Sequence, residues 1–247
     1  MDRITDVYEQ LQNKEDIILG GIVGSFNFKL NDNLSDRDMR FYLMPSLDDL
    51  VRNRVPRQLI LYKDNDIQMH DIRRFLYFVR MGDANMISIL FSDEMVVNPK
   101  FQEFVNLLVS RREEIAEASQ GAIGAWGSSM FNKKMGLLHY YKENELFYEQ
   151  YGYNTKAACQ AFYHIKFINK YLSNLHYNVD EPFKKAIDCS EIREQVLDIK
   201  SGAYTESAFM DLANEEFEVY DHSPQDVCSN LGWLSTEVHE AVKRSVV

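Results

Sequence analysis

Residues 17–23 form a short apolar run, rich in β-branched side chains, that ends in a Gly-Ser dipeptide at 24–25. Such a run, bounded by turn residues, predicts a buried strand that closes in a tight turn. Further along the chain, Asp36 and Asp38 stand two residues apart at the start of a second expected strand, 36–43. Side chains two apart on a strand share one face of the sheet. The chain therefore has to fold with two carboxylates side by side, close in sequence to a glycine turn.

This pattern predicts a particular chemistry. Two carboxylates on one strand face repel each other unless a positive group lies between them. A divalent cation removes the repulsion, and hard oxygen ligands suit Mg²⁺. Gly24 and Ser25 offer backbone N–H groups and a hydroxyl at the strand end, which suit the phosphates of a nucleotide. Together the two features predict phosphoryl-group chemistry, in which two metal ions activate the attacking oxygen and stabilise the leaving pyrophosphate.

The rest of the first half alternates strand and helix patterns. A strand region is expected over 59–70, interrupted by a turn at Asp64-Asn65. Asp71 is the expected N-cap of a helix over 72–81. Further helices are expected over 5–13, over 85–91 and from Pro99 to Ile115.

The second half is predicted to be almost wholly helical. Gly202 stands where a helix C-terminal glycine belongs, and the glycine-rich stretch 121–129 is the expected domain boundary. The fold class is therefore α+β. A small domain with a mixed sheet flanked by helices is expected over 1–120, followed by a mostly α-helical domain over 121–247. Helices of that second domain are expected over 130–148, 155–175, 192–200, 206–217 and 224–244.

Composition argues against several classes of protein. The net charge of −11 disfavours a general nucleic-acid binder, because affinity for phosphate comes mostly from clustered Lys and Arg. No apolar run approaches the roughly 18 residues of a membrane span, and no apolar signal segment opens the chain. The three separated cysteines support neither a disulfide framework nor a zinc site. The expected location is cytoplasmic, with no membrane partner.

The segment from Gly24 to Asp38 resembles the signature of the polymerase β-type nucleotidyltransferases, in which a hydrophobic strand, Gly-Ser and a loop precede Asp-x-Asp. It is most similar to the YcgL-like and RNA-repair-associated predicted nucleotidyltransferases of bacteria and phages. Those proteins share a Ser-Asp-x-Asp-x-Arg run that leads into a hydrophobic strand, here residues 35–43. Similar elements follow at 66–75, at 152–158 (Gly-Tyr-Asn-Thr-Lys-Ala-Ala) and at 199–204 (Ile-Lys-Ser-Gly-Ala-Tyr).

The resemblance implies a small polymerase β-like domain that moves a nucleoside monophosphate from an NTP to an acceptor and releases pyrophosphate. Asp36, Asp38 and Asp66 would be the catalytic carboxylates that bind two Mg²⁺ ions, and Asp66 would lie nearest the acceptor. The residues that would bind the nucleotide are Gly24 and Ser25 on the β- and γ-phosphates, Arg40 on a phosphate oxygen, and Lys156 on the triphosphate or the acceptor.

The sequence departs from the family pattern mainly on the acceptor side. Lys29 replaces a glycine in the middle of the first loop, and residues 83–85 (Asp-Ala-Asn) replace an Asn-Pro-Asn element. On the matching helix of the second domain, two histidines and an arginine are replaced by Ala157, Gln160 and Tyr163. The acceptor therefore stays open among an RNA or tRNA end, a protein and a small molecule.

Several of these assignments have a plainer alternative. Asp64 competes with Asp66 as the third carboxylate, Arg40 also fits a role in neutralising the acidic strand, and Lys156 fits an exposed first-turn residue. The aromatic-rich stretch 139–153 fits the core and rim of a helical bundle, or stacking against a nucleobase. Two other functions compete with the transferase. One is a non-catalytic nucleotide-binding module of the same fold, as in a toxin–antitoxin or phage-defence pair; the other is a metal-dependent hydrolase that uses the same carboxylates.

Overall fold

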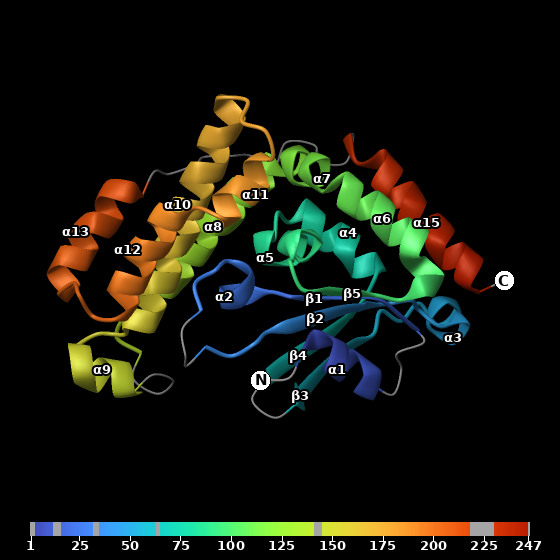
Figure 1. Cartoon of the computed structure of the whole chain (residues 1–247), viewed down its shortest axis with the longest axis horizontal. Helices are drawn as coiled ribbons and strands as arrows, with labels where there is room; N and C mark the ends of the chain where they lie inside the picture. Colours follow the sequence, from blue (N-terminus) through green and yellow to red (C-terminus); the bar gives the residue numbers. More distant parts are fainter. Residues whose placement is uncertain are drawn as a thin grey trace. The chain divides into compact units, whose positions relative to one another are not determined.

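The structure of the protein, a computed structural model, consists of two compact units (Figure 1). The first unit joins residues 1–119 to 226–247, and the second spans 120–225. The domains expected over 1–120 and 121–247 differ from these units at the C-terminus, because the last helix belongs to the first unit. The structure describes residues 3–11, 16–31, 35–62, 65–140, 145–217 and 230–246.

The first unit is built on a mixed five-stranded sheet. Its strands are β1 (Ile17–Ile22), β2 (Met39–Leu43), β3 (Arg57–Tyr62), β4 (Asn65–Asp71) and β5 (Met95–Val97). They lie in the order β3-β4-β2-β1-β5. β1 is antiparallel to both β2 and β5, β2 is parallel to β4, and β4 is antiparallel to β3. The expected strand region over 59–70 is thus a hairpin, while β5 is a strand that the sequence pattern did not predict.

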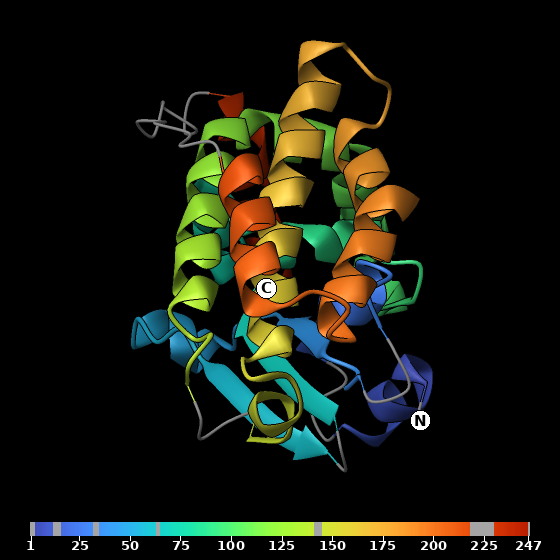
Figure 2. The ribbon, with the colours of Figure 1, turned by 90° about the vertical axis from the view of Figure 1, so that its left-hand side faces the viewer.

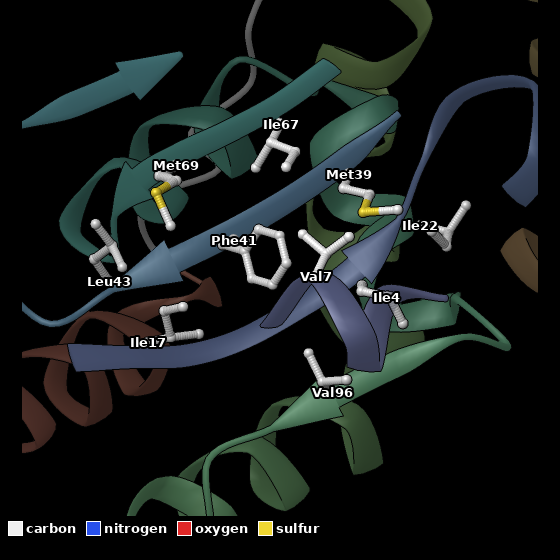
Figure 3. Close-up of a cluster of buried hydrophobic side chains, with 10 residues drawn as sticks. All are labelled: Ile4, Val7, Ile17, Ile22, Met39, Phe41, Leu43, Ile67, Met69 and Val96. Atoms are coloured by element: carbon white, nitrogen blue, oxygen red, sulfur yellow. The ribbon is translucent and has the colours of Figure 1, made fainter. Parts of the chain in front are cut away.

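Helices flank both faces of this sheet, which confirms the α+β fold class at the level of architecture (Figure 1). On one face, α1 (Ile4–Gln10) closes a buried apolar cluster over the strands (Figure 3). On the other face, Phe75 and Phe78 of α4 (Arg73–Arg80) meet Tyr42 and His70 edge-on, with ring centroids 5.5 and 5.2 Å apart. The cluster under α1 comprises Ile4, Val7, Ile17, Ile22, Met39, Phe41, Leu43, Ile67, Met69 and Val96.

Further helices complete the first unit. At the start of α4, Asp71 Oδ1 accepts the backbone N–H of Arg73 at 2.8 Å, but the N-cap residue is Ile72 and not the predicted Asp71, because Asp71 is still part of β4. The helix expected from Pro99 to Ile115 is divided into η3, α6 and α7. The remaining helices are α2 (Gly24–Asn27), α3 (Leu47–Val51), α5 (Ala84–Ile87), α6 (Gln102–Ser110), α7 (Arg112–Ala118) and α15 (Gly232–Ser245), with the 3₁₀ helices η2 (Ser88–Phe91) and η3 (Pro99–Phe101).

The second unit consists of helices in its described part. They are α8 (Gln120–Met135), α9 (Glu145–Tyr151), α10 (Thr155–His176), α11 (Pro182–Ile187), α12 (Ser190–Lys200) and α13 (Glu206–Glu216). The long helix α10 packs against all the others, and Figure 2 shows α8, α10, α12 and α13 running side by side. Most of α10 is buried, so it forms the core of this unit.

The glycine-rich stretch 121–129 is not a linker but the interior of α8. Glycine costs about 1 kcal/mol relative to alanine in a helix, so the sequence pattern favours a break. Packing decides otherwise, because a Cβ at Gly127 would lie only 1.4 Å from Cδ1 of Ile168 on α10. The glycine lets the two helices approach closely. Gly202 has the positive φ of +78° expected of a glycine that follows a helix, here α12.

Candidate functional site

Three strands bring most of the predicted site residues to one end of the sheet. β1 runs toward this end, while β2 and β4 run away from it, because β1 is antiparallel to β2 and β2 is parallel to β4. Gly24 and Ser25 follow β1 and form the first turn of α2 in place of the expected tight turn. Asp38 precedes β2 directly, and Asp66 is the second residue of β4.

Asp38 lies directly against Gly24. The carbonyl oxygen of Asp38 accepts the N–H of Val23 at 2.9 Å, which continues the β1–β2 ladder by one step. Gly24 has a φ of +65°, and a Cβ at this position would lie 2.5 Å from Oδ2 of Asp38. Both the backbone conformation and the space therefore require glycine here. Gly24 therefore leaves the space that the Asp38 carboxylate occupies.

Asp38, directly before β2, and Asp66, in β4, lie at the same end of the β2–β4 pair. The parallel register pairs Met39 with Ile67, which are the residues that follow the two aspartates. Since Met39 and Ile67 both point into the cluster under α1, alternation directs the two carboxylates to the opposite face. Neighbouring strands are about 4.8 Å apart, and this spacing applies to Met39 and Ile67, the paired residues that follow the two aspartates.

Asp36 lies outside the strand that the sequence predicted for it. β2 starts at Met39 and not at Asp36, because strand pairing with β1 ends where Met39 faces Ile22. Asp36 is exposed and has no part in the sheet. Arg37, between the two aspartates, is largely buried, forms an ion pair with Glu94 and stacks over the Phe26 ring, 5.1 Å from its centroid. Arg37 thereby ties this end of the loop to the rest of the unit.

The chemistry of the three aspartates suits a divalent cation, but their arrangement in the structure suits it only in part. Carboxylate oxygens are the ligands that Mg²⁺ prefers, and Asp38 and Asp66 stand on adjacent strands with like charge. Within the described ranges, however, no three His, Cys, Asp or Glu side chains are gathered as they would be around an ion. The backbone thus places two of the three predicted ligands together, and the third, Asp36, stands two residues before Asp38.

The Asp71 carboxylate differs from that of Asp66 in its burial and in its partner. Asp71 is fully buried, and Arg73 holds its carboxylate with a guanidinium contact of 2.6 Å. That pairing and the hydrogen bond from the Arg73 backbone N–H account for Asp71 structurally. Asp64 lies outside the described residues.

Arg40 interacts with neighbours that the sequence pattern did not single out. Its guanidinium donates a hydrogen bond to Oε1 of Gln68, the residue opposite it on β4. Burial raises the pKa of the Asp83 carboxyl, while hydrogen bonds from the Met86 and Asn85 backbone and the charge of Arg40 act in the opposite direction. Both roles considered for Arg40, neutralising the acidic strand and contacting a phosphate, stay predictions. The sequence signal for Gln68 is its spacing: it stands two residues after Asp66 on β4, so the two side chains share one face of the sheet.

Lys156 belongs to the second unit and lines a polar pocket there. Its helix, α10, is capped by Asn154, whose side chain accepts the N–H of Ala157 at 3.0 Å. Ala157 and Gln160, two of the departures from the family pattern, line the same pocket, and the third, Tyr163, is buried. The pocket also contains Lys134, from the last turn of α8.

No helix in the described part of the chain is both long and apolar enough to cross a bilayer. No protein-family model matches the chain, and no curated protein is similar to it in sequence. The geometry of the sheet end is therefore the basis for assigning a function.

Proposed function

We propose that the chain is a Mg²⁺-dependent nucleotidyltransferase with a polymerase β-like first domain, which transfers a nucleoside monophosphate from an NTP to an acceptor. The observation that carries this proposal is the position of Asp38 and Asp66 at the same end of the parallel β2–β4 pair, with Gly24 packed against Asp38. A glycine turn, two neighbouring carboxylates and an exposed third one, Asp36, supply the groups that phosphoryl transfer needs.

Each residue has a role in this proposal. Asp36, Asp38 and Asp66 would hold Mg²⁺, which when bound would neutralise charge on the phosphates and activate the acceptor oxygen. Asp66 would also accept the proton of the acceptor hydroxyl, since a carboxylate within hydrogen-bonding reach acts as a general base. Gly24 and Ser25 would bind the outer phosphates through backbone N–H groups and the serine hydroxyl.

Electrostatics supports a cation at this end of the sheet. Like charges on adjacent strand positions destabilise a sheet by about 0.2–1 kcal/mol for each pair. Neither Asp38 nor Asp66 is deeply buried, so water screens part of this repulsion. A bound divalent cation would convert the remaining repulsion into attraction.

The test is incubation of the whole chain with α-³²P-labelled NTPs, Mg²⁺ and a panel of acceptors that includes RNA, tRNA, the protein itself and small hydroxyl compounds. We expect label to move to at least one acceptor, with release of pyrophosphate. The Asp36→Ala/Asp38→Ala double variant should lose this transfer, and unchanged transfer by that variant would remove the carboxylates from the mechanism.

Other products would identify the competing functions. Binding of NTP with no pyrophosphate release across the panel would favour a non-catalytic nucleotide-binding module. Release of inorganic phosphate or free NMP, without any labelled acceptor, would favour a hydrolase that uses the same carboxylates.

A further inference from the structure

A polar pair lies beside the candidate site, where Arg40 of β2 faces Gln68 of β4 in the parallel register. Their neighbours in sequence on both strands belong to the apolar cluster under α1, so strand alternation places Arg40 and Gln68 on the opposite face of the sheet (Figure 3). Asp66 is two residues before Gln68 on the same strand and therefore shares this face. The pair thus lies on the carboxylate face, two residues further into the sheet.

Hydrogen bonding and charge act on the Arg40 side chain from two elements. Its guanidinium donates a hydrogen bond to Oε1 of Gln68, and because arginine has only donors, this contact fixes which end of the amide faces Arg40. At the start of α5, Asp83 Oδ1 accepts the backbone N–H of Met86 at 3.2 Å. Burial raises the pKa of the Asp83 carboxyl, and the nearby charge of Arg40 acts in the opposite direction. Groups from β4 and α5 therefore surround the guanidinium.

Burial changes along this face of the sheet. Tyr42 and His70, the next paired residues on the same face, are buried against α4. Arg40 and Gln68 are half-buried, and Asp66 is exposed. The Arg40–Gln68 pair therefore stands where the closed core gives way to the open end of the sheet.

We propose that Gln68 is a positioning residue of the nucleotide site, which holds the Arg40 guanidinium at the open end of the sheet for contact with a bound nucleotide. A mobile arginine side chain loses rotamer freedom when it binds a ligand, so a partner that already holds it lowers the entropic cost of binding. Gln68 contributes in this way to nucleotide affinity without touching the nucleotide. The role rests on the proposed function, since that function places the nucleotide at Asp38 and Asp66.

The test is a double-mutant cycle on the Kd of the whole chain for a nucleotide, measured by calorimetry in Mg²⁺. The probe is whichever α,β-methylene analogue of the four NTPs binds the wild type most tightly. Arg40→Met should weaken its binding at least about ten-fold, the size of a lost charge-assisted contact. Gln68→Met removes the acceptor at nearly constant side-chain size and should weaken binding about five-fold, the size of one hydrogen bond. In the Arg40→Met background, Gln68→Met should have no further effect, because Gln68 acts only through Arg40.

Gln102→Met is the matched control. The Gln102 amide donates to Asn106 at 2.8 Å on α6 of the same unit, so this variant also removes one glutamine hydrogen bond, and it should bind the analogue as the wild type does. Circular dichroism spectra check that each variant is folded, and Arg40→Gln replaces Arg40→Met if the latter does not fold.

The possible outcomes separate the role of Gln68 from the proposed function. An equal loss from Gln68→Met in both backgrounds, as a purely structural residue would show, would overturn the role of Gln68 alone. So would wild-type affinity in Gln68→Met or Arg40→Met, or an equal loss in Gln102→Met. If none of the four analogues bound the wild type, the proposed function would fail, and the role of Gln68 with it.

Discussion

The Asp38→Asn variant will transfer nucleotide on the order of 10³-fold more slowly than the wild type, because a lost metal ligand costs several kcal/mol of transition-state stabilisation. Asparagine keeps the size of the side chain beside Gly24 and removes only its charge. We expect the free energy of unfolding to change by less than about 1 kcal/mol, since one like-charge neighbour of Asp66 is removed. Initial rates with labelled NTP and urea unfolding curves measure the two effects.

Asp66→Asn should show the same loss, because Asp66 lies at the same end of the β2–β4 pair as Asp38. Asp48→Asn is the control, since Asp48 is an exposed aspartate of the same unit that pairs with Arg52 and Arg54. Full activity in Asp38→Asn or Asp66→Asn, or an equal loss in Asp48→Asn, would contradict the assigned roles.

Gly24→Ala will reduce turnover by about 100-fold, the size of effect expected when a catalytic group is displaced by about 1 Å. The added methyl group would lie 2.5 Å from Oδ2 of Asp38, so the carboxylate or the start of α2 has to move. The left-handed backbone at this position adds about 1–3 kcal/mol of strain to the folded state. Steady-state rates and unfolding free energies of the same preparation separate the two effects.

Gly152→Ala provides the matched comparison. Gly152 also has a positive φ, of +78°, but a Cβ there would meet no atom within 4 Å. This variant should lose similar stability and keep its transfer rate. If Gly24→Ala lost no more activity than Gly152→Ala, backbone strain alone would explain the effect, and contact with Asp38 would have no role.

The local part of the site could be predicted from the sequence. The apolar run that becomes β1 and the Gly24-Ser25 dipeptide after it are short-range signals, because strand propensity and turn chemistry act within a few residues. Gly202 as a C-terminal glycine is predicted on the same grounds and is confirmed, whereas the cap of α4 is Ile72 and not Asp71, because Asp71 still belongs to β4.

The non-local part could not be derived from sequence pattern alone. The adjacency of Asp38 and Asp66 depends on the parallel pairing of β2 with β4, two strands that α3 and β3 separate along the chain. No local propensity encodes that register. The continuity of α8 through its glycines depends in the same way on its packing against Ile168 of α10. The last helix, α15, joins the first unit through interactions such as Arg111 over the Trp233 ring, 3.5 Å from its centroid.

A crystal structure of the whole chain with Mg²⁺ and a non-hydrolysable NTP tests the central claim most directly. We expect an ion bound by carboxylate oxygens of Asp38 and Asp66, with Asp36 turned toward it and the outer phosphates at Gly24 and Ser25. A nucleotide bound elsewhere, or bound with no ion at these carboxylates, would contradict the proposed function.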